Sequence, residues 1–144
     1  MRGPSVGAAV IQAWERVREP RVQRSVYVIV YLACASAGAS VWHHPPTSIE
    51  GVIGVWLTYG WGTFLLVGGT AAAVAVLPGW WWLEKIGAVS LTTGGAIYAT
   101  TVLALQLSSE GGNRLPQFLI IVAGALLLGL RAYEIRGLDY EPRG

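Results

Sequence analysis

The side chains that most often carry out chemistry are scarce in this 144-residue sequence. Its two histidines, His43 and His44, are adjacent, and its single cysteine, Cys34, stands in an apolar stretch. A zinc site needs three or four ligands, and Glu50 is the only acidic residue near the histidine pair. We therefore expect ordinary loop histidines and no metal site. Cys34 cannot form an intramolecular disulfide and is interpreted as a small packing residue.

Sequence signatures of enzymes are also missing. The sequence contains no nucleophile elbow, no phosphate-binding glycine loop and no zincin motif. Most of its 19 glycines lie in apolar segments, where they cannot form a nucleotide-binding loop. We therefore predict no catalytic residues, no cofactor and a protein that is not an enzyme. The net charge of +2 is not that of a nucleic-acid-binding protein.

The charged residues define the elements of the chain. They make up only 12% of it, about half the share found in soluble domains. Long stretches lack Asp, Glu, Lys and Arg: between Arg24 and Glu50, between Glu50 and Glu84, between Lys85 and Glu110, and between Arg114 and Arg131. A helix that crosses the hydrocarbon core of a membrane needs about 20 apolar residues. The sequence therefore predicts four transmembrane helices, over residues 25–42, 51–77, 86–107 and 115–133.

Helix-breaking sequences separate these four segments. Pro45 and Pro46 follow the first segment, Pro78 follows the second, and a polar, glycine-rich stretch at 108–114 follows the third. Loops this short must join antiparallel neighbours. The predicted fold is an all-α integral membrane protein with an antiparallel four-helix bundle at residues 25–134, a basic arm at 1–24 and a tail at 135–144.

Lys and Arg set the predicted orientation, because in short loops they resist translocation and accumulate on the cytoplasmic side. Nine of the ten lie in the arm, the middle loop and the C-terminal end, and only Arg114 lies in the other loops. We therefore expect both termini in the cytoplasm. The alternative is a cleaved signal peptide, with Ala37-Gly38-Ala39 as an A-x-A-like site, which would leave three spans and an external N-terminus.

The basic arm and the tryptophans predict contacts with the membrane surface. Apolar residues in the arm recur at helical spacing, which predicts a short interfacial amphipathic helix before Pro20, or else an arm that only sets topology. Tryptophan is favoured where membrane meets water. We interpret five tryptophans as interface anchors: Trp14, Trp42, Trp80, Trp81 and Trp82.

Small residues recur along the predicted spans. In lipid, such faces let helix backbones approach closely and pack by van der Waals contact. We expect helix packing at Gly54, Thr58, Gly62, Gly68 and Ala72 in the second span, and at Ser90 and Gly94 in the third. The pattern fits packing within one chain as well as packing between copies in a homo-oligomer.

The remaining charges fall at predicted span boundaries, among them Glu84, Lys85 and Arg131. Ion and proton carriers usually place ionisable residues inside the membrane, so we expect no dedicated ion or proton pathway. Glu50 and Arg114 bracket the starts of the second and fourth spans at the same depth. They are predicted either to form an interhelical ion pair or to be hydrated separately.

Four short strings support a resemblance to known proteins: Pro20-Arg21-Val22-Gln23-Arg24, Pro45-Pro46-Thr47-Ser48-Ile49-Glu50-Gly51, Leu77-Pro78-Gly79-Trp80-Trp81-Trp82-Leu83-Glu84 and Asn113-Arg114-Leu115-Pro116-Gln117. From about Pro20 onward the chain resembles small four-span membrane proteins encoded by tailed phages of actinobacteria. Such proteins are often treated as holins. The resemblance implies assembly in the bacterial host's cytoplasmic membrane, which permeabilises that membrane or releases an endolysin during lysis.

A second class of function stays open on the residues alone. The chain would then be a non-lytic membrane anchor or scaffold that binds a phage or host protein through the arginine-rich arm and the tryptophan loop. The partners that we expect are the lipid bilayer, further copies of the chain and such a protein, but not nucleic acid.

Overall fold

The computed structural model describes residues 21–108 and 112–138, which form five α-helices and no strand. The helices are α2 (Arg21–His43), α3 (Thr47–Ile53), α4 (Val55–Val76), α5 (Trp81–Ser108) and α6 (Leu115–Leu138). All except α3 are long and apolar enough to cross a membrane. The predicted all-α four-helix bundle is confirmed, and the chain is a multi-pass membrane protein. The predicted interfacial helix and Trp14 lie outside the described residues.

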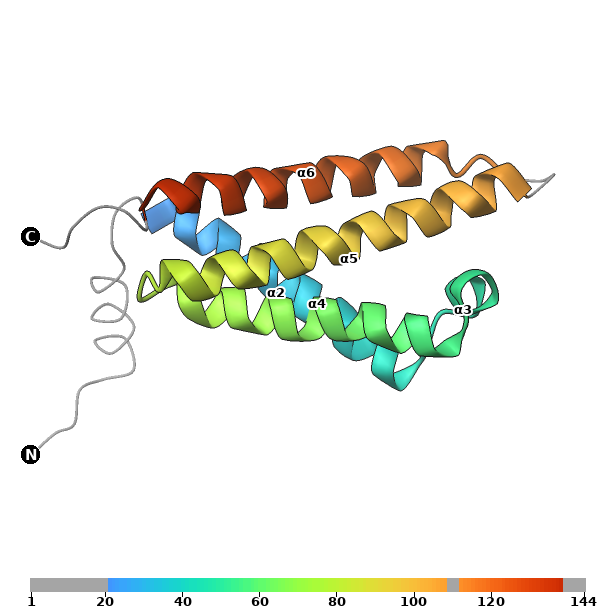
Figure 1. The fold of residues 1–144 in the computed structure, drawn as a ribbon, viewed down its shortest axis with the longest axis horizontal. Helices are drawn as coiled ribbons and strands as arrows, with labels where there is room; N and C mark the ends of the chain where they lie inside the picture. Colours follow the sequence, from blue (N-terminus) through green and yellow to red (C-terminus); the bar gives the residue numbers. More distant parts are fainter. Residues whose placement is uncertain (1–20, 109–111, 139–144) are drawn as a thin grey trace, which may run out of the picture.

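The four long helices run antiparallel in chain order, so that each bundle end collects different segments (Figure 1). We call one end the terminal end: it contains the start of α2, the turn between α4 and α5, and the end of α6. The opposite end, the loop end, contains α3 and the start of α6. The first and last described residues therefore lie at the same end of the bundle.

The second span differs from its predicted bounds because Gly54 interrupts the helix. Gly54 has a φ of +81°, a conformation that side chains other than glycine rarely adopt. The residues before it form the separate helix α3, which begins after Pro46 and buries Ile49. The chain after His43 was predicted to be only a turn. In the structure it folds back as a short helix that packs on α4 and α5.

The other long helices extend beyond the predicted spans at the terminal end. Helix α2 begins at Arg21, α5 at Trp81 and α6 ends at Leu138, whereas the predictions gave residues 25, 86 and 133. The predictions stopped where the apolar stretches stop. A helix need not end there, because polar side chains can continue the same backbone hydrogen bonding outside the hydrocarbon core.

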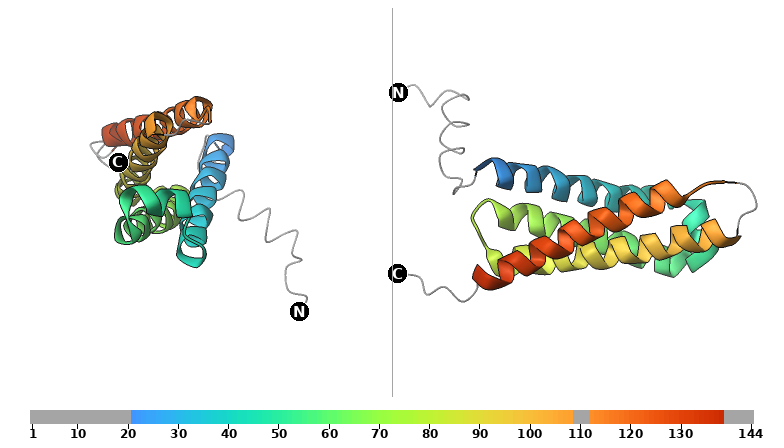
Figure 2. Two further views of the ribbon diagram at one scale, coloured as in Figure 1. Left: turned by 90° about the vertical axis from the view of Figure 1, so that its right-hand side faces the viewer. Right: turned by 90° about the horizontal axis from the view of Figure 1, so that it is seen from above.

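The helices pack in series, and the series does not close. Helix α2 packs on α4, α4 on α5, and α5 on α6, but the first and last helices share no such packed face (Figure 2). Glycines make the first two of these contacts close. A Cβ on Gly69 of α4 would lie 2.7 Å from the Tyr31 carbonyl oxygen on α2, and one on Gly87 of α5 would lie 2.6 Å from the Gly68 carbonyl oxygen on α4.

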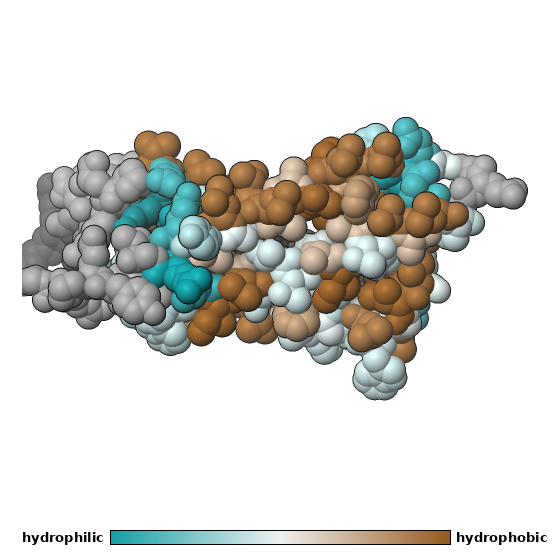
Figure 3. All heavy atoms as spheres, turned by 45° about the horizontal axis from the view of Figure 1, so that its top comes forward, coloured by the Kyte–Doolittle hydropathy of each residue, from teal (hydrophilic) through white to brown (hydrophobic). Residues whose placement is uncertain are grey.

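Apolar side chains cover the outside of the bundle. Figure 3 shows hydrophobic residues over its middle and hydrophilic residues near its two ends. Large apolar side chains such as Ile29 on α2 and Ile120 on α6 are largely exposed. A monomeric soluble protein rarely exposes so much contiguous apolar surface. The distribution is that of a protein whose middle is solvated by lipid and whose ends meet water.

The glycine contacts give a first prediction. Replacing Gly69 by alanine should lower the free energy of unfolding by about 1–3 kcal/mol, because the added methyl group meets the backbone of α2. Unfolding of the purified protein in mixed micelles, driven by increasing SDS and followed by circular dichroism, measures this loss.

Gly60→Ala is the matched control, because it lies on the same helix and a Cβ there would meet nothing within 4 Å. This control should be neutral or stabilise the protein by up to ~1 kcal/mol, since alanine favours a helix. Equal effects of the two substitutions would show that α2 and α4 do not approach each other at Gly69.

Candidate functional site

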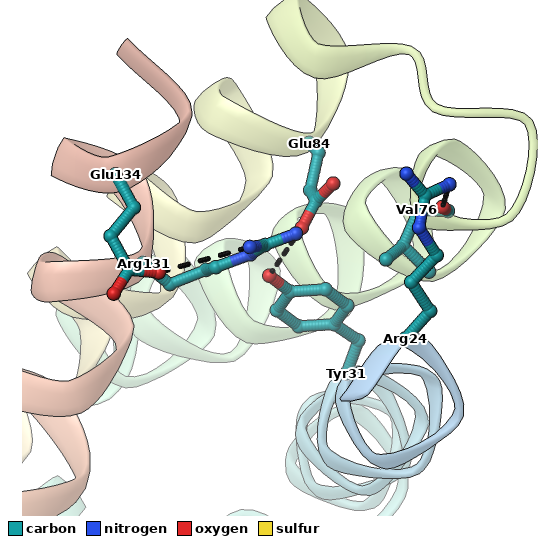
Figure 4. Close-up of polar contacts among 6 residues, drawn as sticks. All are labelled: Arg24, Tyr31, Val76, Glu84, Arg131 and Glu134. Atoms are coloured by element: carbon teal, nitrogen blue, oxygen red, sulfur yellow. Dashed lines mark hydrogen bonds and ion pairs between the residues drawn. The ribbon is translucent and has the colours of Figure 1, made fainter. Parts of the chain in front are cut away.

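The most unusual group in the described part of the chain is a carboxylate with no exposed surface. Glu84 lies in the first turn of α5 and is fully buried. Its Oε1 accepts a hydrogen bond from the Tyr31 hydroxyl of α2 at 3.2 Å and one from Nε of Arg131 of α6 at 2.9 Å. Figure 4 shows the three side chains converging from three helices. We call these residues, together with Tyr27, Arg24 and Trp81, the terminal cluster.

Arg131 contacts residues of three helices, including its own. Its guanidinium forms the ion pair with Glu84 and lies 4.5 Å from the ring centre of Tyr27 on α2. A cation over an aromatic face is attracted by the ring quadrupole, more strongly where water is excluded. Nη1 of Arg131 also lies 3.8 Å from Oε2 of Glu134, one turn further along α6. Arg131 therefore connects α6 to both α5 and α2.

Arg24 occupies the other side of the cluster, at the turn between α4 and α5. It is buried and donates hydrogen bonds to the carbonyl oxygens of Val76 and Leu77 at 3.2 and 3.4 Å. The last carbonyls of a helix have no partner within it and carry partial negative charge, so a cation is stabilised there. The guanidinium also lies 4.9 Å from the ring centre of Trp81.

The sequence around this turn explains why it can be so tight. Gly79 has a φ of +76°, and its N–H and that of Trp80 both donate to the carbonyl oxygen of Ala75. A glycine in this conformation commonly ends a helix and satisfies its last carbonyls. The turn directs Trp81 back over Arg24, which places the start of α5, and with it Glu84, against α2.

The electrostatics of the cluster are incompletely balanced. Oε2 of Glu84 is buried and receives no hydrogen bond from any residue that the structure describes. A buried charge is costly unless it is paired and hydrogen-bonded, above all at the edge of a membrane. The Glu84 carboxylate therefore depends on Arg131 and Tyr31, both of which bind its other oxygen. Removing either charged partner would leave the other charge buried and unpaired.

The predicted boundary charges thus have a different environment from the expected one. Sequence analysis placed Glu84 and Arg131 at span boundaries, and they do lie near the terminal end. They are not hydrated there but are buried between helices. The residues that complete the cluster were not predicted, although Arg24, Tyr27 and Tyr31 follow one another at intervals of three and four. That spacing places them on one face of α2. It is the pattern from which their grouping could have been predicted.

The four predicted anchor tryptophans that the structure describes divide into two groups. Trp42 at the loop end and Trp80 and Trp82 at the terminal end are about half exposed or more, and their role as interface anchors stays a prediction. Trp81 is partly buried, and its ring contacts the guanidinium of Arg24. One residue of the predicted tryptophan loop, Trp81, therefore belongs to the terminal cluster.

Most of the predicted packing residues lie in contacts within the bundle. Gly62 faces Val41 of α2, Gly68 faces Ser90 of α5, and Gly94 faces Leu65 of α4. Thr58 and Ala72 are completely buried. Gly54 is the exception, because it is exposed, has open space around it and interrupts the helix. The small residues thus bring helices of the same chain together.

Glu50 and Arg114 lie at the same end of the bundle but do not form an ion pair with each other. The ion pairs that the structure gives within residues 21–108 and 112–138 are those of Arg131 with Glu84 and Glu134. The backbone N–H of Arg114 donates to Oε1 of Gln106 instead. This leaves the alternative of two separately hydrated charges. In the same described residues, no three His, Cys, Asp or Glu side chains are grouped as metal ligands would be.

Comparisons of this chain with protein-family profiles, with curated proteins and with solved structures gave no match. What the site does must therefore be argued from its own geometry. That geometry is a charged contact that joins three membrane-spanning helices.

The second prediction concerns the energy of this contact. Arg131→Gln should lower the free energy of unfolding by about 3–5 kcal/mol, because it leaves the buried Glu84 carboxylate without its partner. Glu84→Gln should lower it by less, because Glu134 stays within reach of the Arg131 guanidinium. The double variant should cost about 1–3 kcal/mol less than the sum of the two, the usual range for residues in contact. SDS-driven unfolding of the four proteins measures this coupling.

Arg136→Gln serves as the control, since Arg136 is an exposed cation near the same end of α6. It should change the free energy of unfolding by no more than ~0.5 kcal/mol. Strict additivity of Glu84→Gln and Arg131→Gln would mean that the two residues do not interact.

Proposed function

We propose that this chain is a holin-like membrane protein of a phage, which assembles in the cytoplasmic membrane of its bacterial host and permeabilises it or releases an endolysin during lysis. The observation that carries the proposal is the apolar surface of the two outermost helices. Within the most apolar 18 residues of each helix, only 22% are buried in α2 and 17% in α6. Both helices thus offer long apolar faces to lipid or to neighbouring copies.

The lining of two grooves on the bundle favours this proposal over a carrier. One lies between α5 and α6, and the other lies between α3 and α5. Both are lined by apolar residues and threonines, and neither contains a charged group. The hydroxyls of Thr92 and Thr100 in the larger groove donate to carbonyls of their own helix. Such surfaces suit contact with lipid or another helix better than binding of a polar solute.

The terminal cluster also supports assembly rather than transport. Glu84 and Arg131 are paired with each other at one end of the bundle and are not spaced along its length. A proton or ion pathway usually needs several ionisable groups at membrane depth. A closed pair instead lets a monomer accumulate in the membrane without conducting, which is what a protein with a delayed lytic action requires.

The proposal includes an orientation, with both termini in the cytoplasm and the loop end outside. A C-terminal fusion to green fluorescent protein should then be fluorescent, and a C-terminal fusion to alkaline phosphatase should be inactive. The physical reason is the concentration of Lys and Arg near the terminal end. An active phosphatase fusion would reverse the orientation.

The lytic activity itself can be measured by inducible expression in an actinobacterial host. After a lag, a voltage-sensitive dye should report sudden loss of the membrane potential, and a co-expressed endolysin without its own export signal should then lyse the cells. An unrelated four-span protein expressed to the same level is the control for overexpression. An intact membrane potential at high expression would exclude the holin-like function.

A second candidate function is favoured by the exposure of Trp80 and Trp82 beside a fixed Trp81. Two exposed indoles at the terminal end could hold a phage or host protein to the membrane, which would make the chain a non-lytic scaffold. A pull-down with the full chain should then recover a specific protein that a chain lacking residues 1–20, or carrying Trp80→Ala and Trp82→Ala, does not recover. The scaffold function also requires that expression leave the membrane potential intact.

A further inference from the structure

We propose that Arg131 is a releasable latch, which alternates between Glu84 inside the bundle and Glu134 on its own helix, and whose release opens the interior to water from the terminal end. The contacts described above support the movement itself. Its role as the step that precedes assembly and lysis rests on the proposed function.

The first observation is that one guanidinium has two carboxylates within reach. Nε of Arg131 lies 2.9 Å from Oε1 of Glu84, and Nη1 lies 3.8 Å from Oε2 of Glu134. The Glu84 side chain has no exposed surface, whereas 48% of the Glu134 side chain is exposed. Glu134 is three residues further along α6, so it moves with Arg131 wherever that helix goes. The cation can therefore leave the interior and remain paired.

The second observation is that the inner site holds Arg131 imperfectly. Both donors bind Oε1 of Glu84, and Oε2 is buried with no described partner. Desolvation of two buried charges offsets much of their attraction, whereas a hydrated pair with Glu134 costs little desolvation and contributes little. Moving Arg131 to Glu134 therefore replaces an imperfect buried pair with a hydrated one, but leaves the Tyr31 hydroxyl as the only described partner of the buried Glu84 carboxylate.

The third observation is that few contacts oppose the movement. Helices α2 and α6 share no packed face. They are in contact where the Arg131 guanidinium of α6 lies over the Tyr27 ring of α2. The close packing of α2 on α4 does not involve this guanidinium, and between α5 and α6 the close approach at Gly95 and Ala125 remains without it. Figure 4 shows Arg131 reaching from α6 toward Glu84 and Tyr31. Its withdrawal removes a long charged side chain from the terminal end of the interior.

The chain contains its own reporter of this opening. Cys34 is the only cysteine, is partly buried and packs against the core. It lies seven residues after Tyr27 and three after Tyr31, so it is on the same face of α2 but deeper in the membrane. A thiol surrounded by apolar groups reacts slowly with a water-soluble maleimide, because the thiolate is the nucleophile and needs water. Opening of the terminal end should therefore raise its reaction rate.

The experiment measures the rate at which a water-soluble maleimide modifies Cys34 in the full-length protein in liposomes. Glu84→Gln removes the inner partner and should accelerate modification by about tenfold or more, because leaving Arg131 buried without its partner costs more than 1.4 kcal/mol. Glu134→Gln removes the outer partner and should slow modification by about two- to threefold, as expected for a partly exposed pair. Arg136→Gln should leave the rate unchanged.

The opposite signs separate a latch from a merely structural contact. If the cluster only stabilised the fold, Glu134→Gln would leave the rate unchanged or raise it, and either result would overturn the proposal. An unchanged rate in Glu84→Gln would also overturn it. Circular dichroism of each variant identifies a protein that fails to fold. If Glu84→Gln does not fold, the labelling rate of Glu134→Gln still tests the proposal, because that side chain is partly exposed.

A parallel measurement separates the latch from the lytic function. In cells that express the same variants, Glu84→Gln should shorten the lag before depolarisation and Glu134→Gln should lengthen it. If Cys34 responds as expected but no variant depolarises the membrane, the latch stands and the proposed function fails. If the cells depolarise but Cys34 reacts at the same rate in all variants, the proposed function stands and the latch fails.

Discussion

A charge that is buried at the edge of a membrane needs a partner, and in this chain the buried pair and its aromatic neighbours also connect α2 to α6, two helices that share no packed face. Glu84 and Arg131 lie on α5 and α6, and their contacts with Tyr31 and Tyr27 reach α2. Helix–helix packing alone would leave an open series from α2 to α6. The ion pair and its aromatic neighbours are what hold the two ends of that series at a defined separation.

The rest of the bundle depends on close backbone approach and on a hydrogen bond between α4 and α5. In lipid there is little hydrophobic driving force between helices, so close packing and hydrogen bonds must hold them together. Gly69 and Gly87 supply the close packing. In the middle of the bundle, the indole N–H of Trp61 on α4 donates to the carbonyl oxygen of Gly94 on α5 at 3.0 Å. The polar cluster is thus confined to one end of an otherwise apolar structure.

Much of this architecture could be predicted from the sequence because it follows from composition and period. The charge-free stretches between Arg24 and Glu84 gave the first two spans, and the prolines gave the turns. The break at Gly54 was missed because its φ depends on α3 folding back against α4 and α5. Burial of Glu84 was missed for a similar reason, since a charge at a helix end is hydrated or buried according to what a distant helix places beside it. Function was least accessible, because neither spans nor packing residues identify a partner.

The central claim is that Arg131 and Glu84 are in direct contact in the membrane. Solid-state NMR of the protein in lipid bilayers, with ¹⁵N-labelled arginine and ¹³C-labelled glutamate carboxyl groups, measures this contact through the dipolar coupling between guanidinium and carboxylate. We expect a measurable coupling, consistent with the 2.9 Å ion pair, from which the Glu84 contribution is lost in Glu84→Gln while the coupling is unchanged in Arg136→Gln. A wild-type spectrum with no coupling that depends on Glu84 would contradict the account.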